Sequence, residues 1–262
     1  MFISASHINI KLKQDFAKFR HSKYLKMLVL CDGIGEFPLS NIVSQKVCEV
    51  LLDKGYDDIN SVLYDADIRK LASLPDKAGT TIIFAKVKKE SELIIQYLGN
   101  GGCIHFDGTF AKTNENLPIY RFTQLISPHV NQNGVLVKHL SNDGGKTERT
   151  RTKITYSINN VFGDVFLFFT DGINSNENNI IIKDDEGRYW RNECSSLIYV
   201  LDMLNLFLIE NSGNVNFQDA LEDFNRDILK KLHNLEMLDD DASIGIVISQ
   251  RVLDYYNKNS ND

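Results

Sequence analysis

The chain has 262 residues, of which 43% are hydrophobic, so it is long enough to enclose a substantial core. Its 29 basic and 35 acidic residues give a formal net charge of -6, which argues against a protein that neutralises nucleic-acid phosphates with a basic face. The four cysteines include no CxxC pair, and their spacing from the histidines does not suggest a zinc site.

No segment has the features of a secretion signal or a membrane span. Residues 1–16 lack the long apolar stretch and the small-residue cleavage site of a signal peptide. The most apolar later stretch, Leu197 to Ile209, is interrupted by Asp202 and Asn205 and is too short to cross a bilayer. We interpret it as a buried helix, and we expect a cytoplasmic monomer without nucleic-acid or membrane partners.

The first predicted elements are a buried strand and two helices. Met27 to Leu30 form a short, continuous apolar run, typical of a strand that is buried on both faces, and an Asp-Gly-Ile-Gly turn ends it. Ser40 is the predicted N-cap of a helix that ends at Gly55. Asp57 or Asp58 can cap a second helix. The apolar side of this second helix comprises Ile59, Val62, Leu63 and Ala66.

The middle of the chain has β character. Strands rich in β-branched and aromatic residues are predicted at 80–87, 92–98, 103–106 and 119–126. Asp107-Gly108, between two of these strands, is a hairpin signal. A polar stretch at 142–153 precedes another buried strand at 165–169, which ends at Thr170-Asp171-Gly172.

Helical patterns return near the end of the chain, at Ser195 to Glu210 and Phe217 to His233, and Ile244 to Ile248 form a closing strand. Helices at both ends with antiparallel-looking strands between them predict an α+β fold rather than a doubly wound parallel one. No internal repeat or low-complexity linker interrupts the pattern. A single domain over residues 1–262 is therefore expected.

Three apolar strands each touch a short acidic turn, in the segments MLVLCDGIG, VFLFFTDG and LDDDASIGIVI. A carboxylate at the end of a buried strand is held rigidly and is partly dehydrated. Several such groups that converge repel one another unless cations lie among them, and Mg²⁺ and Mn²⁺ favour oxygen ligands of this kind. The candidates are Asp32, Asp171 and Asp240.

Each Asp-Gly pair also has a simpler interpretation as a turn. The pairs begin at Asp32, Asp107, Asp143 and Asp171. For Asp107 and Asp143 we keep the turn interpretation, because the first lies in a predicted hairpin and the second in a polar loop. For Asp32 and Asp171, local spacing leaves a turn and a functional role equally open, and the order of the motifs along the chain has to decide.

That order begins with an acidic motif, Gln14-Asp15-Phe16-Ala17, and continues with the Asp32–Gly35 turn and a GTT strand at Gly79–Thr81. The later motifs are Gly99-Asn100-Gly101, Thr170-Asp171-Gly172 and the acidic pair Asp240-Asp241. Together these motifs resemble, over nearly the whole chain, the metal-dependent protein phosphatase family, the type 2C serine/threonine phosphatases.

The resemblance implies a four-layer αββα sandwich, two antiparallel sheets flanked by helices, with two Mn²⁺ or Mg²⁺ ions at one end. The implied metal ligands are Asp32, the carbonyl group of Gly33, Asp171 and Asp240. Asp15 would act on the ions through a bridging water. A run of three aspartates leaves Asp239 open as an alternative to Asp240.

Some positions depart from the family pattern. Many members carry an arginine that holds the substrate phosphate where this chain has Ile10, which leaves Lys11 and Lys13 as substitutes. Asn100 replaces an aspartate that helps to bind a third, weaker metal in the family, so a third metal is not expected here. Residues 173–195 correspond to a variable flap of the family and are expected to influence substrate choice.

The activity implied is hydrolysis of phosphomonoesters on serine or threonine residues of a phosphoprotein, by a water molecule that two ions activate. The alternative is a weak or inactive pseudophosphatase that binds a phosphoprotein or a kinase. Asp32, Asp171 and Asp240 favour the enzyme, whereas Ile10 and Asn100 favour the alternative.

Overall fold

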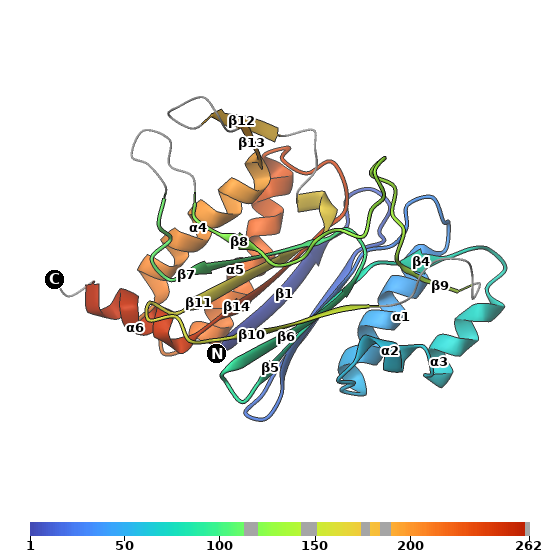
Figure 1. Ribbon diagram of the computed structural model, residues 1–262, viewed down its shortest axis with the longest axis horizontal. Helices are drawn as coiled ribbons and strands as arrows, with labels where there is room; N and C mark the ends of the chain where they lie inside the picture. The colour runs from blue at the N-terminus through green and yellow to red at the C-terminus, as the bar shows by residue number, and fades with distance from the viewer. Residues whose placement is uncertain (113–119, 143–150, 174–178, 184–189, 260–262) are drawn as a thin grey trace.

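Two antiparallel five-stranded sheets pack face to face, and helices cover both outer faces (Figure 1). The structure is a computed structural model. It describes residues 1–112, 120–142, 151–173, 179–183 and 190–259, and for 179–183 and 190–194 it describes the backbone alone.

The first sheet has the strand order β10-β6-β5-β3-β2. Its strands are β2 (Phe16–His21), β3 (Lys26–Cys31), β5 (Ile82–Lys88), β6 (Glu92–Leu98) and β10 (Thr152–Ser157). After Lys26, every residue of β3 is buried, because helices cover one face of this sheet and the second sheet covers the other.

The second sheet has the strand order β1-β14-β11-β7-β8. Its strands are β1 (Phe2–Ile8), β7 (Gly102–Asp107), β8 (Thr123–Gln124), β11 (Asp164–Phe169) and β14 (Ala242–Ile248). Every residue of β11 and β14 is buried, which explains their continuous apolar sequences.

The helices form the two outer layers, one on each side in Figure 1. The first sheet is covered by α1 (Ser40–Asp53), α2 (Ile59–Val62), α3 (Ala66–Arg69) and the 3-10 turn η1 (Lys70–Ser73). The second is covered by α4 (Ser195–Asn211), α5 (Phe217–Asn234) and α6 (Gln250–Asn259). A third core lies between the sheets. The predicted α+β fold with four layers is confirmed.

Two small sheets complete the described fold. One joins β4 (Gly79–Thr80) to β9 (Leu140–Ser141), and the other joins β12 (Asn179–Lys183) to β13 (Trp190–Cys194), inside the predicted flap segment. In the part of the chain that the structure describes, no helix is both long and apolar enough to cross a bilayer.

Of the predictions at the helix starts, the cap at Ser40 was wrong, whereas Asp58, one of the two predicted caps of the second helix, was confirmed. Ser40 is the first residue of α1 rather than its N-cap, and the capping residue Leu39 makes no side-chain bond. Asp58 caps α2 by accepting a hydrogen bond from the N–H of Asn60 at 2.8 Å. That helix ends after four residues because the chain turns there and Asp65 caps a separate helix, α3.

The prediction of a tight hairpin at Asp107 was also wrong, because a long connection follows this residue before β8 begins. Its Oδ1 accepts a hydrogen bond from the N–H of Thr109 at 2.9 Å, so Asp107 closes a local turn. The strand predicted at 119–126 is reduced to the two residues of β8, and the chain from 108 to 122 lies between β7 and β8. Asp143 lies outside the described residues.

Candidate active site

The register of the first sheet brings Asp15 beside Asp32. Phe16, the first residue of β2, pairs with Cys31, the last residue of β3, so the two aspartates just beyond that pair are neighbours. The backbone of Asp32 is fixed as well, because its carbonyl oxygen accepts a hydrogen bond from the N–H of Thr81 at 2.7 Å. The Asp-Gly turn after β3 therefore has a defined position at the end of the sheet.

The register of the second sheet brings Asp171 beside the acidic run that precedes β14. Phe169 pairs with Ile244, so the residues just after β11 lie next to those just before β14. Gly172 packs against this run: a Cβ atom at residue 172 would lie 2.0 Å from the carbonyl oxygen of Asp241. The close approach of the two backbones requires glycine after Asp171.

Asp15 joins the two sheets at this end. Its carboxylate is fully buried, and Oδ2 accepts hydrogen bonds from Thr170 Oγ1 at 2.8 Å and from Ser243 Oγ at 2.7 Å. These hydroxyl groups belong to the second sheet, whereas Asp15 leads into the first. The carboxyl group of Asp15 also interacts with that of Asp32.

Burial and mutual repulsion raise the pKa values of the clustered carboxyl groups. Burial raises the pKa of Asp15 to about 7, against the opposing effect of its hydrogen bonds. Burial, followed by the charges of Asp15 and Asp171, raises the pKa of Asp32 well above its usual range. Burial also raises the pKa of Asp171, and the charge of Asp240 adds to it. Asp171 nevertheless stays partly exposed to solvent.

The three consecutive aspartates before β14 differ in their surroundings. The charge of Asp240 acts on Asp171, and its Oδ1 accepts a hydrogen bond from the N–H of Asp241 at 2.9 Å. Asp239 Oδ1 is buried without a hydrogen-bond partner within the described residues. The charge of Asp240 thus acts on the cluster, and the choice between Asp239 and Asp240 as a ligand stays a prediction.

Asp241 anchors the loop that carries Lys11 and Lys13, and beyond the run of aspartates no local pattern indicated this role. Its Oδ1 accepts hydrogen bonds from the N–H groups of Ile10 and Lys11, both at 2.7 Å, and its Oδ2 accepts one from Gln14 at 2.8 Å. The side chains of Lys11 and Lys13 are exposed. The loop is therefore fixed through its backbone, while its ammonium groups stay in solvent.

Gly33 is held by tight backbone packing beside the cluster, whereas Asn100 contacts the cluster through a hydrogen bond. A Cβ atom at Gly33 would lie 2.7 Å from the Cβ of Gln14 and 2.9 Å from the Cβ of Ser40, so the turn is packed tightly against α1 and the loop before β2. The Nδ2 group of Asn100 donates a hydrogen bond to Asp171 Oδ2 at 2.6 Å. Asn100 thus contacts the cluster as a hydrogen-bond donor.

The donor chemistry of the cluster fits a divalent ion. Carboxylate oxygens such as those of Asp32, Asp171 and Asp240 are ligands that Mg²⁺ and Mn²⁺ prefer. The buried Asp15 Oδ1 receives no hydrogen bond from an ordinary donor among the described residues, so its contact with Asp32 needs a shared proton or a nearby cation. As they stand, no three described His, Cys, Asp or Glu side chains have the geometry of an ion site.

The raised pKa of Asp15 predicts that the metal-free protein loses stability as the pH rises. Asp15 holds its proton more tightly in the folded state than in the unfolded state, where its pKa is 3.8. Its contribution is therefore complete below about pH 4 and is lost as the pH approaches about 7. We expect the melting temperature in EDTA to fall by roughly 5 °C over this range because of Asp15.

Calorimetric melting of the Asp15→Asn variant provides the control, because the neutral amide oxygen can still accept from Thr170 and Ser243. We expect the pH slope of this variant to be smaller than that of the wild type. If the two proteins show the same slope, Asp15 does not titrate in this way.

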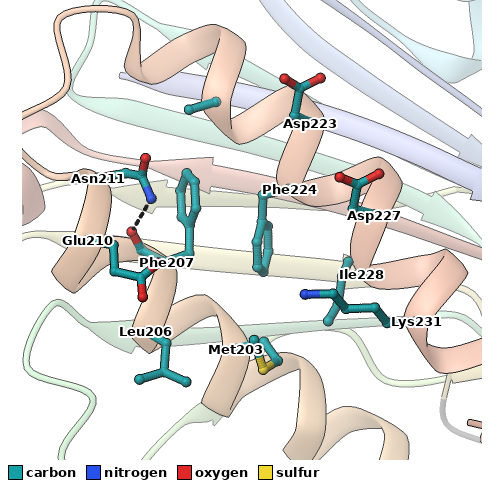
Figure 2. A pocket seen from close by; sticks show the side chains of 11 residues that line it. Met203, Leu206, Phe207, Glu210, Asn211, Asp223, Phe224, Asp227, Ile228 and Lys231 are labelled. Atoms are coloured by element: carbon teal, nitrogen blue, oxygen red, sulfur yellow. Dashed lines mark hydrogen bonds between the residues drawn. The ribbon is translucent and has the colours of Figure 1, made fainter.

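A separate groove of about 370 Å³ lies between α4 and α5 (Figure 2). Met203 and the tilted rings of Phe207 and Phe224, whose centroids are 4.8 Å apart, contribute its apolar part. Asp223 on its rim is paired with Arg226 of the same helix. The groove contains none of the clustered aspartates, and nothing in the structure shows what covers it, so we assign no site there.

Several solved structures share this arrangement. A bacterial serine phosphatase matches with a TM-score of 0.60 at 14% identity, over 94% of this chain and 97% of that chain. RsbX in complex with magnesium matches with a TM-score of 0.52 at 12% identity, over 94% of each chain. The PPM Ser-Thr phosphatase MsPP from Mycobacterium smegmatis, in complex with cacodylate, matches with a TM-score of 0.51 at 12% identity, over 94% of this chain and 97% of that one. The chain has the fold of the metal-dependent protein phosphatases, here called the PPM fold.

The PPM fold also occurs in a longer neighbour. A C. elegans sex determining protein matches with a TM-score of 0.61 at 13% identity, over 97% of this chain but 66% of that chain. No family model matches the sequence, and no curated protein matches it either. At these identities, the likeness to PPM phosphatases establishes the fold, and the chemistry has to be argued from the residues of this chain.

Proposed function

We propose that this chain is a metal-dependent phosphatase that hydrolyses phosphomonoesters of serine or threonine residues in a partner protein. The observation that carries the proposal is the gathering of four aspartates from separate strand ends at one end of the sandwich. These aspartates are Asp15, Asp32, Asp171 and Asp240. Such a cluster is unfavourable without protons or cations, and the PPM fold supports a phosphatase rather than an unrelated metal protein.

Each residue of the cluster has a proposed role. Two Mn²⁺ or Mg²⁺ ions would be held by Asp32, the Gly33 carbonyl, Asp171 and Asp240. When bound, the ions supply a water of lowered pKa and stabilise negative charge on the phosphoryl oxygens. Asp15 would act through a water molecule, and its hydrogen bonds from Thr170 and Ser243 hold its carboxylate in place.

The loop anchored by Asp241 is the proposed contact for the substrate phosphate. Its backbone is hydrogen-bonded to Asp241, the residue after the proposed ligand Asp240, and the side chains of Lys11 and Lys13 are exposed. Positive charge there attracts a dianionic phosphate and offsets the repulsion from the aspartates. A lysine cannot form the two parallel hydrogen bonds of an arginine, so we expect weak orientation of the phosphate.

The Lys11→Ala/Lys13→Ala double variant is expected to raise the KM for a phosphothreonine peptide roughly fivefold while leaving the melting temperature unchanged. The matched control is Lys23→Ala, an exposed lysine in the turn between β2 and β3, at the other end of the sheet. Steady-state kinetics at low salt measures the KM of the double variant and of the control. An equal change in the double variant and the control would remove the loop from the proposed site.

Phosphate release with and without chelator tests the function itself. Hydrolysis of p-nitrophenyl phosphate and of a phosphothreonine peptide should be lost in EDTA and restored by Mn²⁺ or Mg²⁺. Full activity in EDTA, or inhibition by a thiol-alkylating reagent, would contradict the proposal. The described cysteines Cys31, Cys48 and Cys103 are buried, so thiol chemistry is not expected.

A pseudophosphatase that binds a phosphoprotein or a kinase is the second candidate. Two observations favour it: Asn100 stands beside Asp171 as an amide, and Ile10 begins the anchored loop in place of an arginine. Tight Mn²⁺ binding by calorimetry without any phosphate release would select this candidate. The monomeric state and the cytoplasmic location stay predictions of the sequence under either candidate.

A further inference from the structure

The turn at residues 99–101 joins β6 to β7 and carries Asn100. Gly99 has a φ of +125°, and a Cβ atom there would lie 2.4 Å from the Cβ of Thr81. A Cβ atom at Gly101 would lie 2.8 Å from a backbone carbonyl oxygen at the end of β11. The turn is thus pressed between the two sheets, and the position of Asn100 depends on the backbone of this turn.

His129 holds both polar backbone groups of Gly99. The His129 N–H donates to the Gly99 carbonyl at 2.8 Å, and the Gly99 N–H donates to His129 Nδ1 at 3.1 Å. Because Nδ1 accepts, the ring proton is assigned to Nε2, which lies 2.8 Å from Thr152 Oγ1. The ring also stacks on Tyr97, with centroids 4.7 Å apart and planes 12° apart. The imidazole is therefore fixed on three sides.

We propose that His129 is a positioning residue that sets the orientation of the Asp171 carboxylate through Gly99 and Asn100. The last step is the hydrogen bond from Asn100 Nδ2 to Asp171 Oδ2 at 2.6 Å. A hydrogen bond from a neighbouring group to a metal-binding carboxylate fixes the direction in which the carboxylate points. The effect on metal binding rests on the proposed function, whereas the effect on the Asn100 hydrogen bond does not.

Two substitutions separate positioning from a general contribution to stability. In His129→Asn, the side-chain oxygen takes the place of Nδ1 and can still accept from Gly99. In His129→Gln, the side-chain amide reaches toward Thr152 but leaves the Gly99 N–H without its acceptor. Both variants lose the ring that stacks on Tyr97. A purely structural histidine would therefore be affected alike by the two changes.

The first readout is the Asn100 side-chain amide proton, measured by NMR in the metal-free protein and assigned by its absence in Asn100→Ser. It should be shifted downfield and slow to exchange in the wild type and in His129→Asn. It should lose both properties in His129→Gln. If the signal is the same in the two His129 variants, the proposal is overturned.

The second readout is Mn²⁺ affinity by calorimetry. The Kd should rise about tenfold in His129→Gln and stay near the wild-type value in His129→Asn. Asn100→Ala should show the same rise, and the double variant should show no further rise, since both changes break one chain of contacts. Additive losses would overturn the proposal. An unchanged Kd in Asn100→Ala would overturn it even if His129→Gln failed to fold. If the wild type bound no Mn²⁺, the proposed function would fail, while the Asn100 signal would still decide the role of His129.

Discussion

Replacing Asp171 by asparagine is expected to lower phosphatase turnover by at least about a hundredfold without unfolding the protein. The amide has nearly the same shape, so it still fits the turn after β11, where Gly172 packs against the backbone of Asp241. What it removes is a negative charge beside Asp32 and Asp240, and hence a proposed ligand. Loss of that charge also relieves repulsion, so the melting temperature of the metal-free variant should rise.

The matched control is Asp107→Asn, because Asp107 also precedes glycine at the end of a buried strand. Its Oδ1 accepts a hydrogen bond from Thr109, an interaction that an asparagine oxygen reproduces. It lies at the far end of β7 from Gly102, which pairs with Phe169 near the acidic cluster. Turnover at saturating Mn²⁺, with metal affinity by calorimetry, should be unchanged. A silent Asp171→Asn together with a damaging Asp107→Asn would show that the active site has been misplaced.

Replacing Asp241 by alanine is expected to reduce the free energy of unfolding by about 3–5 kcal/mol. The buried carboxylate accepts from the N–H groups of Ile10, Lys11 and Gln14, and alanine would leave all three without that partner. The free energy of unfolding of Asp241→Asn should lie between those of the wild type and Asp241→Ala. The amide oxygen can accept from two of these groups, but the amide presents its own N–H to the third. Urea denaturation monitored by circular dichroism measures both.

The control for Asp241 is Asp254→Ala, in the last helix. Asp254 is exposed and accepts a hydrogen bond from Gln250 one turn earlier, so its loss should cost less than about 0.5 kcal/mol. A destabilised but folded Asp241→Asn variant should also show a raised KM, since the loop with Lys11 and Lys13 would be less fixed. Equal stability of Asp241→Ala and the wild type would mean that water replaces the carboxylate at no cost.

The sequence by itself determined the most apolar strands and the long helices, whereas no local pattern predicted β1, β2 or β10. Val165–Phe169 is apolar at every position and Ile244–Ile248 at every position except Gly245, which favours strands covered on both faces, and the structure buries each of these residues. The long helices at Ser195–Asn211 and Phe217–Asn234 also followed from local pattern. The order of the acidic turns then indicated the PPM fold. Each strand, helix and acidic turn is recognised within a short stretch of chain, and the order of the turns can be read directly along the sequence.

The tertiary structure alone decided which side chains meet. The Asp241 carboxylate accepts hydrogen bonds from residues that precede it by 227 to 231 positions. The Asp15 carboxylate accepts hydrogen bonds from hydroxyl groups 155 and 228 positions away. Strand register and the packing of one sheet on the other bring such groups together, and a local pattern carries no information about either. For the same reason, the sequence left Asp239 and Asp240 as alternatives and showed no link between His129 and Gly99. A change of one residue in register would have exchanged the roles of neighbouring aspartates.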